Sequence, residues 1–527
     1  MEKRLIIAVT LSIIIIMTFQ YLFPAPKRPT GAVQSTSGKP GLIKEIEQKP
    51  YEPALPPAEE KEFTVPTNRF NIIFSNIGGA IKKIELKDYK KLDSNEPLPL
   101  VEALDPREYL FSTKDALGSL PLDSSAYELS KKDSEITYTL TLKDMQIVKQ
   151  YILHNSNNII ELQLFVKNIS GSPKQFAYKI IGGSNMVEPH MQDKRLIETI
   201  SSIDGKIVNF KRSKNNIVVN NGNVNWVASK IRYFSVILKP FAQTRSEFHS
   251  MPREDNLVAG VEMQTVTIPA GSFVEQKFIL YAGPSKITEL KKAGYEFEES
   301  VNYGFFGAIA KILLAATALL NNILHSWGLS IIVLSVLLNV ILFPLTLKSF
   351  KSMQKMHELH PQMEKLKAQH KDNPQKLNKE VMELYKKYNI NPFSGCLPLI
   401  LQMPIFIALY QALTKSIDLR GASFLWIKDL SAPDAVPIPF ALPIFGNSIN
   451  ILPLAMIVLM VFQQKISAKV MGGAVTEEQK QQQKMMLVIM PIMFGFIFYN
   501  MPSGMVLYWV INTILTIVEQ AAILKNS

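Results

Sequence analysis

The chain has 527 residues, of which 57 are Lys or Arg and 45 are Asp or Glu, so its formal net charge at pH 7 is +12. This length predicts more than one domain, and the basic excess favours partners such as nucleic acid, the ribosome or anionic lipid. The one cysteine, Cys396, excludes an internal disulfide and a cysteine-based zinc or redox site, and we expect a small buried residue near a helix start. Hydrophobic residues make up 47% of the chain and gather in long uncharged runs, which indicates a membrane protein.

The N-terminus combines a basic tetrapeptide, MEKR, with an uncharged run from Leu5 to Phe23. This run is similar to a signal peptide, but it approaches the ~20 residues that a membrane-spanning helix needs. The following PAPKRPTGA has no clear A-x-A cleavage site, so we expect an uncleaved transmembrane anchor over residues 1–23, with its start in the cytoplasm. A cleaved signal peptide is the alternative. Residues 24–61, rich in Pro, Lys, Glu, Gly and Ser, predict an extended or disordered linker.

Residues 62–284 alternate between apolar and polar side chains and are rich in β-branched and aromatic residues. The alternation is clearest in RFNIIFSN, EITYTLTLKD, QIVKQYILH and IIELQLFVKN, and Gly, Asn and Pro separate these runs. The pattern predicts a soluble all-β sandwich. Because one membrane crossing precedes it, we expect this domain on the side opposite the cytoplasm.

Residues 285–326 predict a linker followed by a helix over 304–325. Lys311, Asn322 and His325 share one side of this helix, and the opposite side is apolar, formed by Phe305, Ile309, Ile312, Ala316, Leu319 and Ile323. This amphipathic pattern favours a helix that lies in the membrane interface. A further membrane span is the alternative.

Five spans are expected in residues 327–524, which gives six with the anchor and puts both termini in the cytoplasm. The segment 347–392 contains ten Lys, whereas 417–448 contains only Arg420 and Lys428, so the ten-Lys segment is expected inside. The fourth of these five spans, 485–499, has about 15 apolar residues, which correspond to ~22 Å of helix. This short length predicts local thinning of the bilayer. The expected spans are 327–347, 394–416, a segment within 437–462 that is clearest from 449, 485–499 and 505–524.

The cytoplasmic segment 348–392 predicts a basic helical hairpin. Phe350, Met356 and Leu366 recur at helical spacing, and Asn373 is a plausible N-cap ahead of Pro374. A Met-rich apolar stripe beside Lys suits the binding of varied hydrophobic segments, while a solvated connector is the alternative. The candidate contact residues are Lys348, Lys351, Met353, Lys355, Met356, Met363 and Lys365.

No catalytic motif, nucleotide-binding loop or metal-ligand cluster is evident, so we expect no catalytic residue, metal or cofactor. The spans from 327 onward lack Asp and Glu in their interiors and show no inverted repeat, which argues against a proton-coupled carrier.

The spans do carry neutral polar residues at helical spacing. Ser335 and Asn339 share one face, Tyr508 and Asn512 share another, and Gln402 interrupts a third apolar run. Such residues commonly bond helices together, but three polar faces also favour a shared hydrated cavity. Asn339 therefore has two possible environments: another helix caps its amide, or water reaches it.

Four motifs resemble the YidC/Oxa/Alb family of membrane protein insertases. They are FPLTLKSFKSMQKMHELHPQMEKLK, NPFSGCLPLILQMPIFIALYQAL, LWIKDLS and MPSGMVLYWVINTILTIVEQ, in this order. The anchor, the β domain and VNWVASKIRYFSVILKP make the chain similar to the Gram-negative bacterial form. The resemblance covers essentially the whole chain and is strongest over residues 300–523.

The resemblance implies a polytopic α-helical membrane protein with a five-helix core and a large periplasmic all-β supersandwich. It implies an insertase and chaperone of the bacterial inner membrane that uses a hydrophilic groove and no nucleotide, alone or with the Sec translocon. The implied partners are nascent integral membrane proteins, the ribosome or targeting factors at the cytoplasmic face, and lipids, with no sequence-specific nucleic acid.

Family members typically carry an arginine in the groove, five residues before the proline of FPLT, where this chain has Asn339. A neutral amide costs less to hold in a bilayer than an arginine, and it offers no electrostatic attraction to acidic substrates. The C-terminus also lacks the long basic tail of some members. The implied groove residues are Ser335, Asn339, Gln402, Tyr508, Trp509 and Asn512, with Trp509 standing where a Tyr is common.

Two other functions are compatible with parts of the pattern. A transporter for small solutes or lipids would use the same polar cavity, and a sugar-processing β domain would use the sandwich. The absence of buried carboxylates in the spans weighs against the transporter, and no catalytic pair is identifiable in the sandwich.

Overall fold

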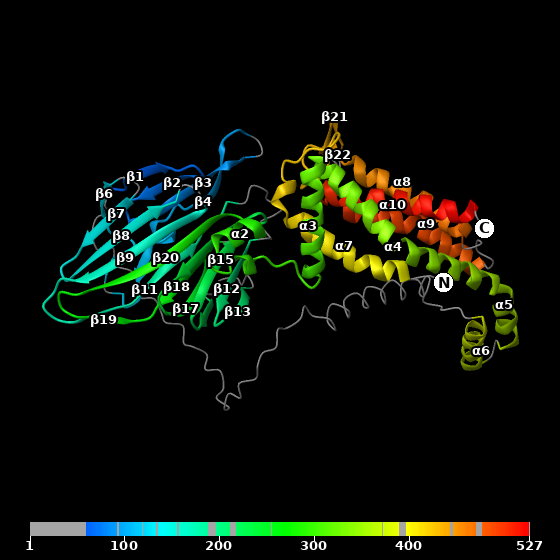
Figure 1. Ribbon diagram of the computed structural model, residues 1–527, viewed down its shortest axis with the longest axis horizontal. Coiled ribbons are helices and arrows are strands. Elements are labelled where there is room, and N and C mark those ends of the chain that lie inside the picture. The colour runs from blue at the N-terminus through cyan, green and yellow to red at the C-terminus, as the bar shows by residue number, and fades with distance from the viewer. Residues whose placement is uncertain are drawn as a thin grey trace. The chain divides into compact units, whose positions relative to one another are not determined.

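The computed structural model contains two compact units, one of which ends at Asn302 and the other of which begins at Tyr303 (Figure 1). The predicted anchor over 1–23, most of the linker and Cys396 lie outside the residues that the structure describes. The described residues are 59–91, 94–118, 120–132, 135–154, 157–187, 197–210, 218–253, 256–370, 373–388, 397–442, 446–470 and 477–525.

The first unit is built on a nine-stranded antiparallel sheet. Its strands, in spatial order, are β13 (Lys206–Phe210), β12 (Glu198–Ile203), β15 (Val224–Lys230), β16 (Phe234–Pro240), β20 (Phe273–Pro284), β9 (Ile159–Asn168), β8 (Met145–Leu153), β7 (Glu135–Thr141) and β6 (Glu128–Lys132).

Smaller sheets lie against this large one. A four-stranded sheet contains β1 (Glu62–Pro66), β2 (Phe70–Ser75), β3 (Ala80–Lys90) and β4 (Pro97–Glu102). A five-stranded sheet contains β14 (Val218–Asn221), β17 (Thr244–Arg253), β18 (Asn256–Met263), β11 (Tyr178–Gly183) and β5 (Thr113–Asp115). The strands β10 (Lys174–Phe176) and β19 (Val266–Ile268) form a separate pair. The predicted all-β sandwich is confirmed.

The inner face of β8 shows why the alternating sequence folds in this way. Met145, Ile147, Lys149 and Tyr151 are buried, and the residues between them are partly exposed. The Tyr151 ring lies 5.0 Å from that of Phe74 on β2, so the large sheet and the four-stranded sheet share a core. Burial of large apolar and aromatic side chains between sheets is the main stabilising contribution to such a domain.

The inner face of β8 also carries one charged residue. Lys149 is fully buried, and its Nζ donates hydrogen bonds to the carbonyl oxygens of Gly78, at 2.7 Å, and Phe111, at 2.8 Å. The Tyr151 hydroxyl donates to the carbonyl oxygen of Gly79 at 2.6 Å. Desolvation lowers the pKa of Lys149 to about 7, although the charge of Asp123 opposes the shift.

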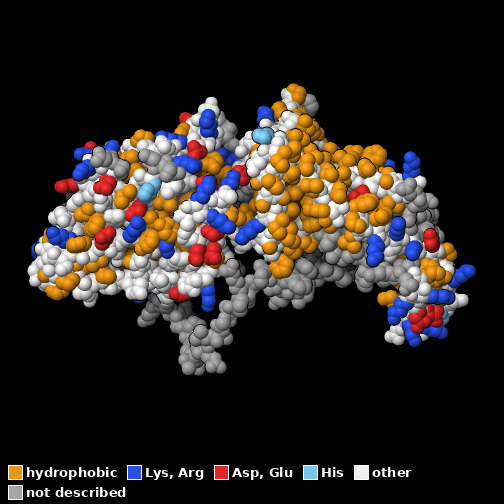
Figure 2. All heavy atoms as spheres, in the orientation of Figure 1, with side chains coloured by type: hydrophobic (Ala, Val, Ile, Leu, Met, Phe, Trp, Pro, Cys, Tyr) orange, Lys and Arg blue, Asp and Glu red, His pale blue; other side chains and the backbone are white. Residues whose placement is uncertain are grey.

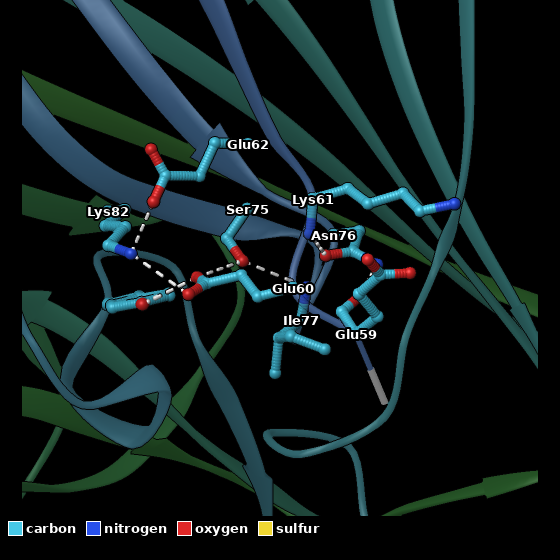
Figure 3. A network of polar contacts seen from close by, with 9 residues as sticks. Glu59, Glu60, Lys61, Glu62, Ser75, Asn76, Ile77 and Lys82 are labelled. Atoms are coloured by element: carbon cyan, nitrogen blue, oxygen red, sulfur yellow. Dashed lines mark hydrogen bonds and ion pairs between the residues drawn. The ribbon is translucent and has the colours of Figure 1, made fainter. Parts of the chain in front are cut away.

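A polar network fixes the segment that leads into β1 (Figure 3). Glu60 accepts hydrogen bonds from Ser75 and Tyr109, both at 2.7 Å, and from Lys82 at 3.0 Å, and Lys82 also pairs with Glu62 at 2.5 Å. Burial alone would raise the pKa of Glu60, but these three donors outweigh it and lower the pKa.

The second unit is helical and begins with α3 (Gly307–Leu324), while α2 (Ile287–Ala293) still belongs to the first unit. Ala310, Leu313 and Thr317 are the buried positions of α3, which packs against α4 and α7. Figure 1 shows α3 running across the long axis of the other helices rather than along it. The predicted apolar side is exposed, with Phe305, Ile312, Leu319 and Ile323 uncovered by protein.

The remaining helices are α4 (Trp327–Glu358), α5 (His360–Gln369), α6 (Pro374–Lys387), α7 (Leu397–Lys415), α8 (Ile451–Val470), α9 (Glu477–Phe498) and α10 (Ser503–Lys525). Short 3-10 helices occupy Pro106–Glu108, Phe297–Ser300 and Ile417–Leu419. By length and composition, α3, α4, α8 and α10 suffice to cross a membrane, and α9 has a shorter apolar stretch, Leu487–Phe498.

Three boundaries differ from the expected ones. The helix α4 continues past residue 347 to Glu358, because no Gly or Pro lies between Pro344 and Glu358 to end it. The helix α9 begins at Glu477, eight residues before the expected start at 485, because polar Gln and Lys residues are good helix formers. The third span was expected within 437–462 and most clearly from 449. Its helix α8 begins at Ile451, and the earlier part of the segment instead contains β21 (Val436–Leu442) and β22 (Gly446–Ile449).

The expected cap at the start of α6 is confirmed. The Asn373 side chain accepts a hydrogen bond from the Lys376 backbone N–H at 3.0 Å, and Pro374 is the first residue of α6. His370 and Glu380, 2.9 Å apart, tie α5 to α6.

Candidate functional site

Two polar contacts between helices meet on one face of α10. Asn339 on α4 contacts Asn512, and Gln402 on α7 contacts Tyr508. Tyr508 and Asn512 are four residues apart, so they share one face of α10. We call Asn339, Gln402, Tyr508 and Asn512 the polar seam.

The Asn339 amide is capped by another helix. Its Nδ2 donates to the Asn512 Oδ1 at 2.8 Å and to the Ser335 backbone carbonyl at 2.9 Å, so both donors of the amide are used. Asn339 and Asn512 are each half-buried. Ser335 is fully buried, and its hydroxyl donates to the Ile331 carbonyl at 2.7 Å within its own helix. Another helix therefore caps the Asn339 amide, as one of the two expected environments required, and its side chain is also partly exposed.

The second contact lies one turn nearer the start of α10. The Gln402 Nε2 donates to the Tyr508 hydroxyl at 2.7 Å, and Tyr508 is almost completely buried. Pro404 lies inside α7 two residues later and has no backbone N–H of its own. The seam is therefore uncharged and is made of side chains that both donate and accept hydrogen bonds.

Trp509 does not join the seam. It lies in an aromatic cluster with Phe406, Phe494 and Phe498, with ring centroids 4.9, 5.5 and 5.1 Å from its own. This cluster joins α7, α9 and α10 beside the polar contacts. Sequence reasoning missed the three phenylalanines, although Phe494 and Phe498 are spaced as neighbours on one helix face.

Nearer the C-terminal end of α10, the polar side chains bond within the helix or to α8. The Thr516 hydroxyl donates to the Asn512 carbonyl at 2.9 Å, within α10 itself. The next contact between helices joins the Ser467 hydroxyl on α8 to the Gln520 Oε1 at 3.0 Å, a pair that sequence reasoning did not identify.

The opposite end of the bundle carries a buried polar clamp, formed by Asp434 and Asn450. Asp434 accepts hydrogen bonds from the backbone N–H groups of Ile451 and Leu452 at 2.8 and 2.9 Å, so it caps α8. Asn450 accepts from the Ala435 N–H at 2.8 Å and donates to the Tyr499 carbonyl at 2.7 Å. The clamp fixes the ends of α8 and α9, and the sequence motifs gave no sign of it.

The expected cytoplasmic contact residues differ in exposure. Lys348, Lys351, Lys355 and Lys365 are exposed, whereas Met356 and Met363 are half-buried. The Tyr385 hydroxyl lies 3.3 Å from the Met363 sulfur, so this methionine packs inside the α5–α6 hairpin. Met353 lies on α4, and its side chain is outside the described ones. Figure 2 shows basic side chains over α5 and α6, together with a cluster of acidic ones. Among the described residues, no group of His, Cys, Asp and Glu is arranged to hold a metal ion.

Two family models together match almost all of the described chain. The model described as "YidC periplasmic domain" matches residues 62–316, and the model described as "60Kd inner membrane protein" matches residues 319–527.

Full-length relatives show the same similarity. The membrane protein insertase YidC of Geotalea daltonii is 33% identical over an alignment that covers 100% of this chain and 99% of the relative. The insertase of Geobacter metallireducens is 32% identical with the same coverage, and that of Syntrophobacter fumaroxidans is 28% identical over 99% of each chain.

Two solved structures are similar to part of the chain. A galactose mutarotase related enzyme from Lactobacillus acidophilus is 12% identical and aligns with 42% of this chain and 97% of its own, with a TM-score of 0.31. A galactose mutarotase-like protein from Lactobacillus casei is 11% identical and aligns with 42% of this chain and 100% of its own, with a TM-score of 0.30.

Proposed function

The chain belongs to the YidC family of membrane protein insertases, and we propose that its polar seam lies on the path of the substrate. The protein is an integral inner-membrane protein that inserts membrane proteins, and members of this family are insertases rather than enzymes. Its substrates are therefore nascent membrane proteins. The proposal adds the residues that receive them: the seam, with Ser335 and Trp509 beside it.

The Asn339–Asn512 pair carries the proposal. A polar substrate segment that crosses lipid leaves its peptide groups without partners, at a cost of several kcal/mol each. Amide side chains on neighbouring helices bond to each other with a mean gain of only about 0.6 kcal/mol. The pair therefore exchanges partners cheaply, and each freed amide offers the substrate both a donor and an acceptor. Burial of the substrate's apolar segment in lipid drives the overall reaction.

The proposal includes a topology. The chain crosses the inner membrane six times, with both termini in the cytoplasm and the β unit in the periplasm. The exposed lysines of α4 and the α5–α6 hairpin support a cytoplasmic position. The exposed apolar side of α3 and its crosswise direction (Figure 1) support an interfacial helix rather than a further span.

The proposal also includes the sites of contact with partners. The hairpin, through Lys348, Lys351, Lys355 and Lys365, contacts the ribosome or targeting factors, because exposed cations attract polyanions and acidic proteins. Met353 and Met356 adapt to varied apolar segments, whereas Met363 supports the hairpin from within. The β unit contacts the Sec translocon on the periplasmic side. The protein also acts as a chaperone that folds and assembles its substrates.

Reconstitution tests the insertase without other factors. The purified protein in lipid vesicles receives a single-span substrate with a short polar tail, and protease protection of that tail is measured without ATP. We expect protection well above that of empty vesicles. Absence of protection for every tail would exclude autonomous insertion, and solute flux without any protein substrate would instead support a transporter.

Variants of Asn339 test the seam itself. Asn339→Leu removes the amide and should reduce insertion of the polar tail about tenfold, equivalent to about 1.4 kcal/mol. Val336→Leu, on an exposed face of the same helix, is the matched control and should leave insertion unchanged. Asn339→Arg should favour an acidic tail over a neutral one, whereas the unchanged protein should treat the two alike. Equal insertion by all three variants would place the substrate path elsewhere.

A further inference from the structure

The segment between α7 and α8 contains an uncharged hairpin that is not part of any helix. Residues 436–449 include no Asp, Glu, Lys or Arg. Figure 1 shows β21 and β22 projecting from the end of the bundle near α3, and Figure 2 shows a largely hydrophobic surface there. Pro437 and Pro439 on β21 are exposed. Exposing the apolar surface of such a projecting hairpin to water costs free energy.

A second apolar projection comes from the same segment. Backbone hydrogen bonds of 2.9 Å in both directions join Phe424 and Ile427 and close a tight turn. Leu425 and Trp426, at the tip of this turn, are 75% and 46% exposed. Leu425 has a φ of +52°, a conformation that a bulky residue adopts only at some cost. The turn therefore holds two large apolar side chains outside the protein.

The two projections are fixed to each other and to the bundle. The Trp426 Nε1 donates to the Asp434 Oδ2 at 3.3 Å, and the same oxygen caps the start of α8 at Ile451. A Cβ on Gly328 of α4 would lie 2.1 Å from the Phe424 ring, so this ring lies directly against the α4 backbone. The exposed side chains are thus presented rigidly.

The charges around the turn also show a preference for one environment. Lys428 is exposed two residues after Trp426. The nearby acids are less exposed: Asp434 is buried, and Asp429 is half-buried and accepts a hydrogen bond from the Ser431 N–H at 2.8 Å. An exposed cation beside Trp and Leu is the composition typical of the boundary between lipid headgroups and acyl chains.

The apolar surface continues into α8. Ile451, Leu454, Val458 and Phe462 are exposed along this helix, and they begin where the hairpin ends. In an integral membrane protein, such a face borders lipid. We propose that Leu425, Trp426 and the strands β21 and β22 form a lipid anchor, which enters the headgroup–acyl boundary of the bilayer and fixes the depth of α8.

Strand addition by another protein fits this hairpin less well. Pro437 and Pro439 have no backbone N–H, so β21 offers fewer unpaired donors to an added strand. The same absence of donors lowers the cost of entering a lipid interface. Lipid is therefore the occupant that the chemistry favours, and protein contact is an outcome for the test to detect.

Spin labels test the lipid anchor in the full chain. Cys396→Ser provides a cysteine-free parent, into which Leu425→Cys or Ile438→Cys is introduced and labelled with a nitroxide in vesicles of phosphatidylethanolamine and phosphatidylglycerol. Collision with oxygen, which concentrates in lipid, is compared with collision with a water-soluble nickel complex. Lys206→Cys, at the exposed start of β13, provides the aqueous reference, and Phe496→Cys, 84% exposed on α9, provides the hydrocarbon reference.

We expect both anchor positions to give oxygen-to-nickel ratios between those of the two references. A ratio equal to that of Lys206→Cys would place the positions in water and overturn the proposal. Low access to both reagents would show protein contact, such as a second copy of the chain, and would also overturn it. Should the cysteine variants fail to fold, lipids brominated near the headgroup should quench the fluorescence of the unchanged protein more than that of Trp426→Phe. Equal quenching would contradict the lipid anchor.

Discussion

Two polar sites, one in each unit, hold their side chains in different ways. In the β unit, Lys149 and Tyr151 bond to backbone carbonyl oxygens of other strands and turns. In the helical unit, the polar seam is made of side chains that bond to other side chains, such as Asn339 to Asn512. A backbone acceptor moves only when the chain moves, whereas an amide side chain rotates about its own bonds. The first arrangement fixes a structure, and the second permits a change of partner.

The largest effect on stability is expected when the hydrogen bonds from Lys149 to the backbone are removed. Lys149→Met keeps a long apolar side chain but leaves the carbonyl oxygens of Gly78 and Phe111 without their donor. An unsatisfied buried group costs about 1–3 kcal/mol, so the free energy of unfolding of the β unit should fall by about 4 kcal/mol. Hydrogen exchange of amides in β2, β3 and β8 of the full-length protein measures this. Lys206→Met, at an exposed site, should change little, and equal protection in the two variants would contradict the role given to Lys149.

The same lysine predicts a dependence of stability on pH. Its pKa is about 7 in the folded protein and 10.5 in the reference state, so between these values the unfolded chain binds more protons. Stability should therefore rise as pH increases from 7 toward 10.5, by up to about 1.4 kcal/mol per pH unit. Hydrogen exchange corrected for its intrinsic pH dependence measures the slope. Lys149→Met should lack this contribution; an identical slope would assign the effect to other groups.

The sequence predicted the β unit well because a strand buries every second residue. The same alternation carries a further signal: in QIVKQYILH, Lys149 occupies an inward position between Ile147 and Tyr151. A charged residue at an inward position predicts a buried, hydrogen-bonded group. Local pattern thus identified the layer but not the partners, which come from turns 71 and 38 residues away along the chain.

The helical unit was predicted less completely. Helical spacing placed Asn339, Tyr508 and Asn512 on polar faces, but spacing within one helix does not say which faces meet. The hairpin β21–β22 was included in an expected span segment because it is as apolar as a helix that crosses lipid, and hydropathy does not distinguish the two. The Asp434–Asn450 clamp depends on contacts between distant loops, which no local pattern reports.

An intermediate effect is expected at the clamp, which bonds a side chain to backbone as in the β unit. Asp434→Ala removes the cap of α8 and should lower stability by about 0.5–2 kcal/mol. Asp434→Asn retains an acceptor and should recover most of the loss. Thermal unfolding in detergent, followed by hydrogen exchange at the start of α8, measures both variants. If Asn and Ala are equally destabilising, the negative charge rather than the cap is what stabilises the α8 terminus.

The smallest effect is expected at the polar seam, and its small size is what the proposed function requires. A double-mutant cycle with Asn339→Leu and Asn512→Leu isolates the energy of the amide pair, because each single variant leaves one amide without its partner and the double variant removes both. We expect a coupling of about 0.6 kcal/mol, the typical value between membrane helices. A coupling above about 3 kcal/mol would make the seam as rigid as the Lys149 site and would leave no inexpensive exchange for a substrate. Weak coupling together with strongly reduced insertion in Asn339→Leu would separate the two roles: the amides contribute little to holding the helices together and much to receiving the substrate.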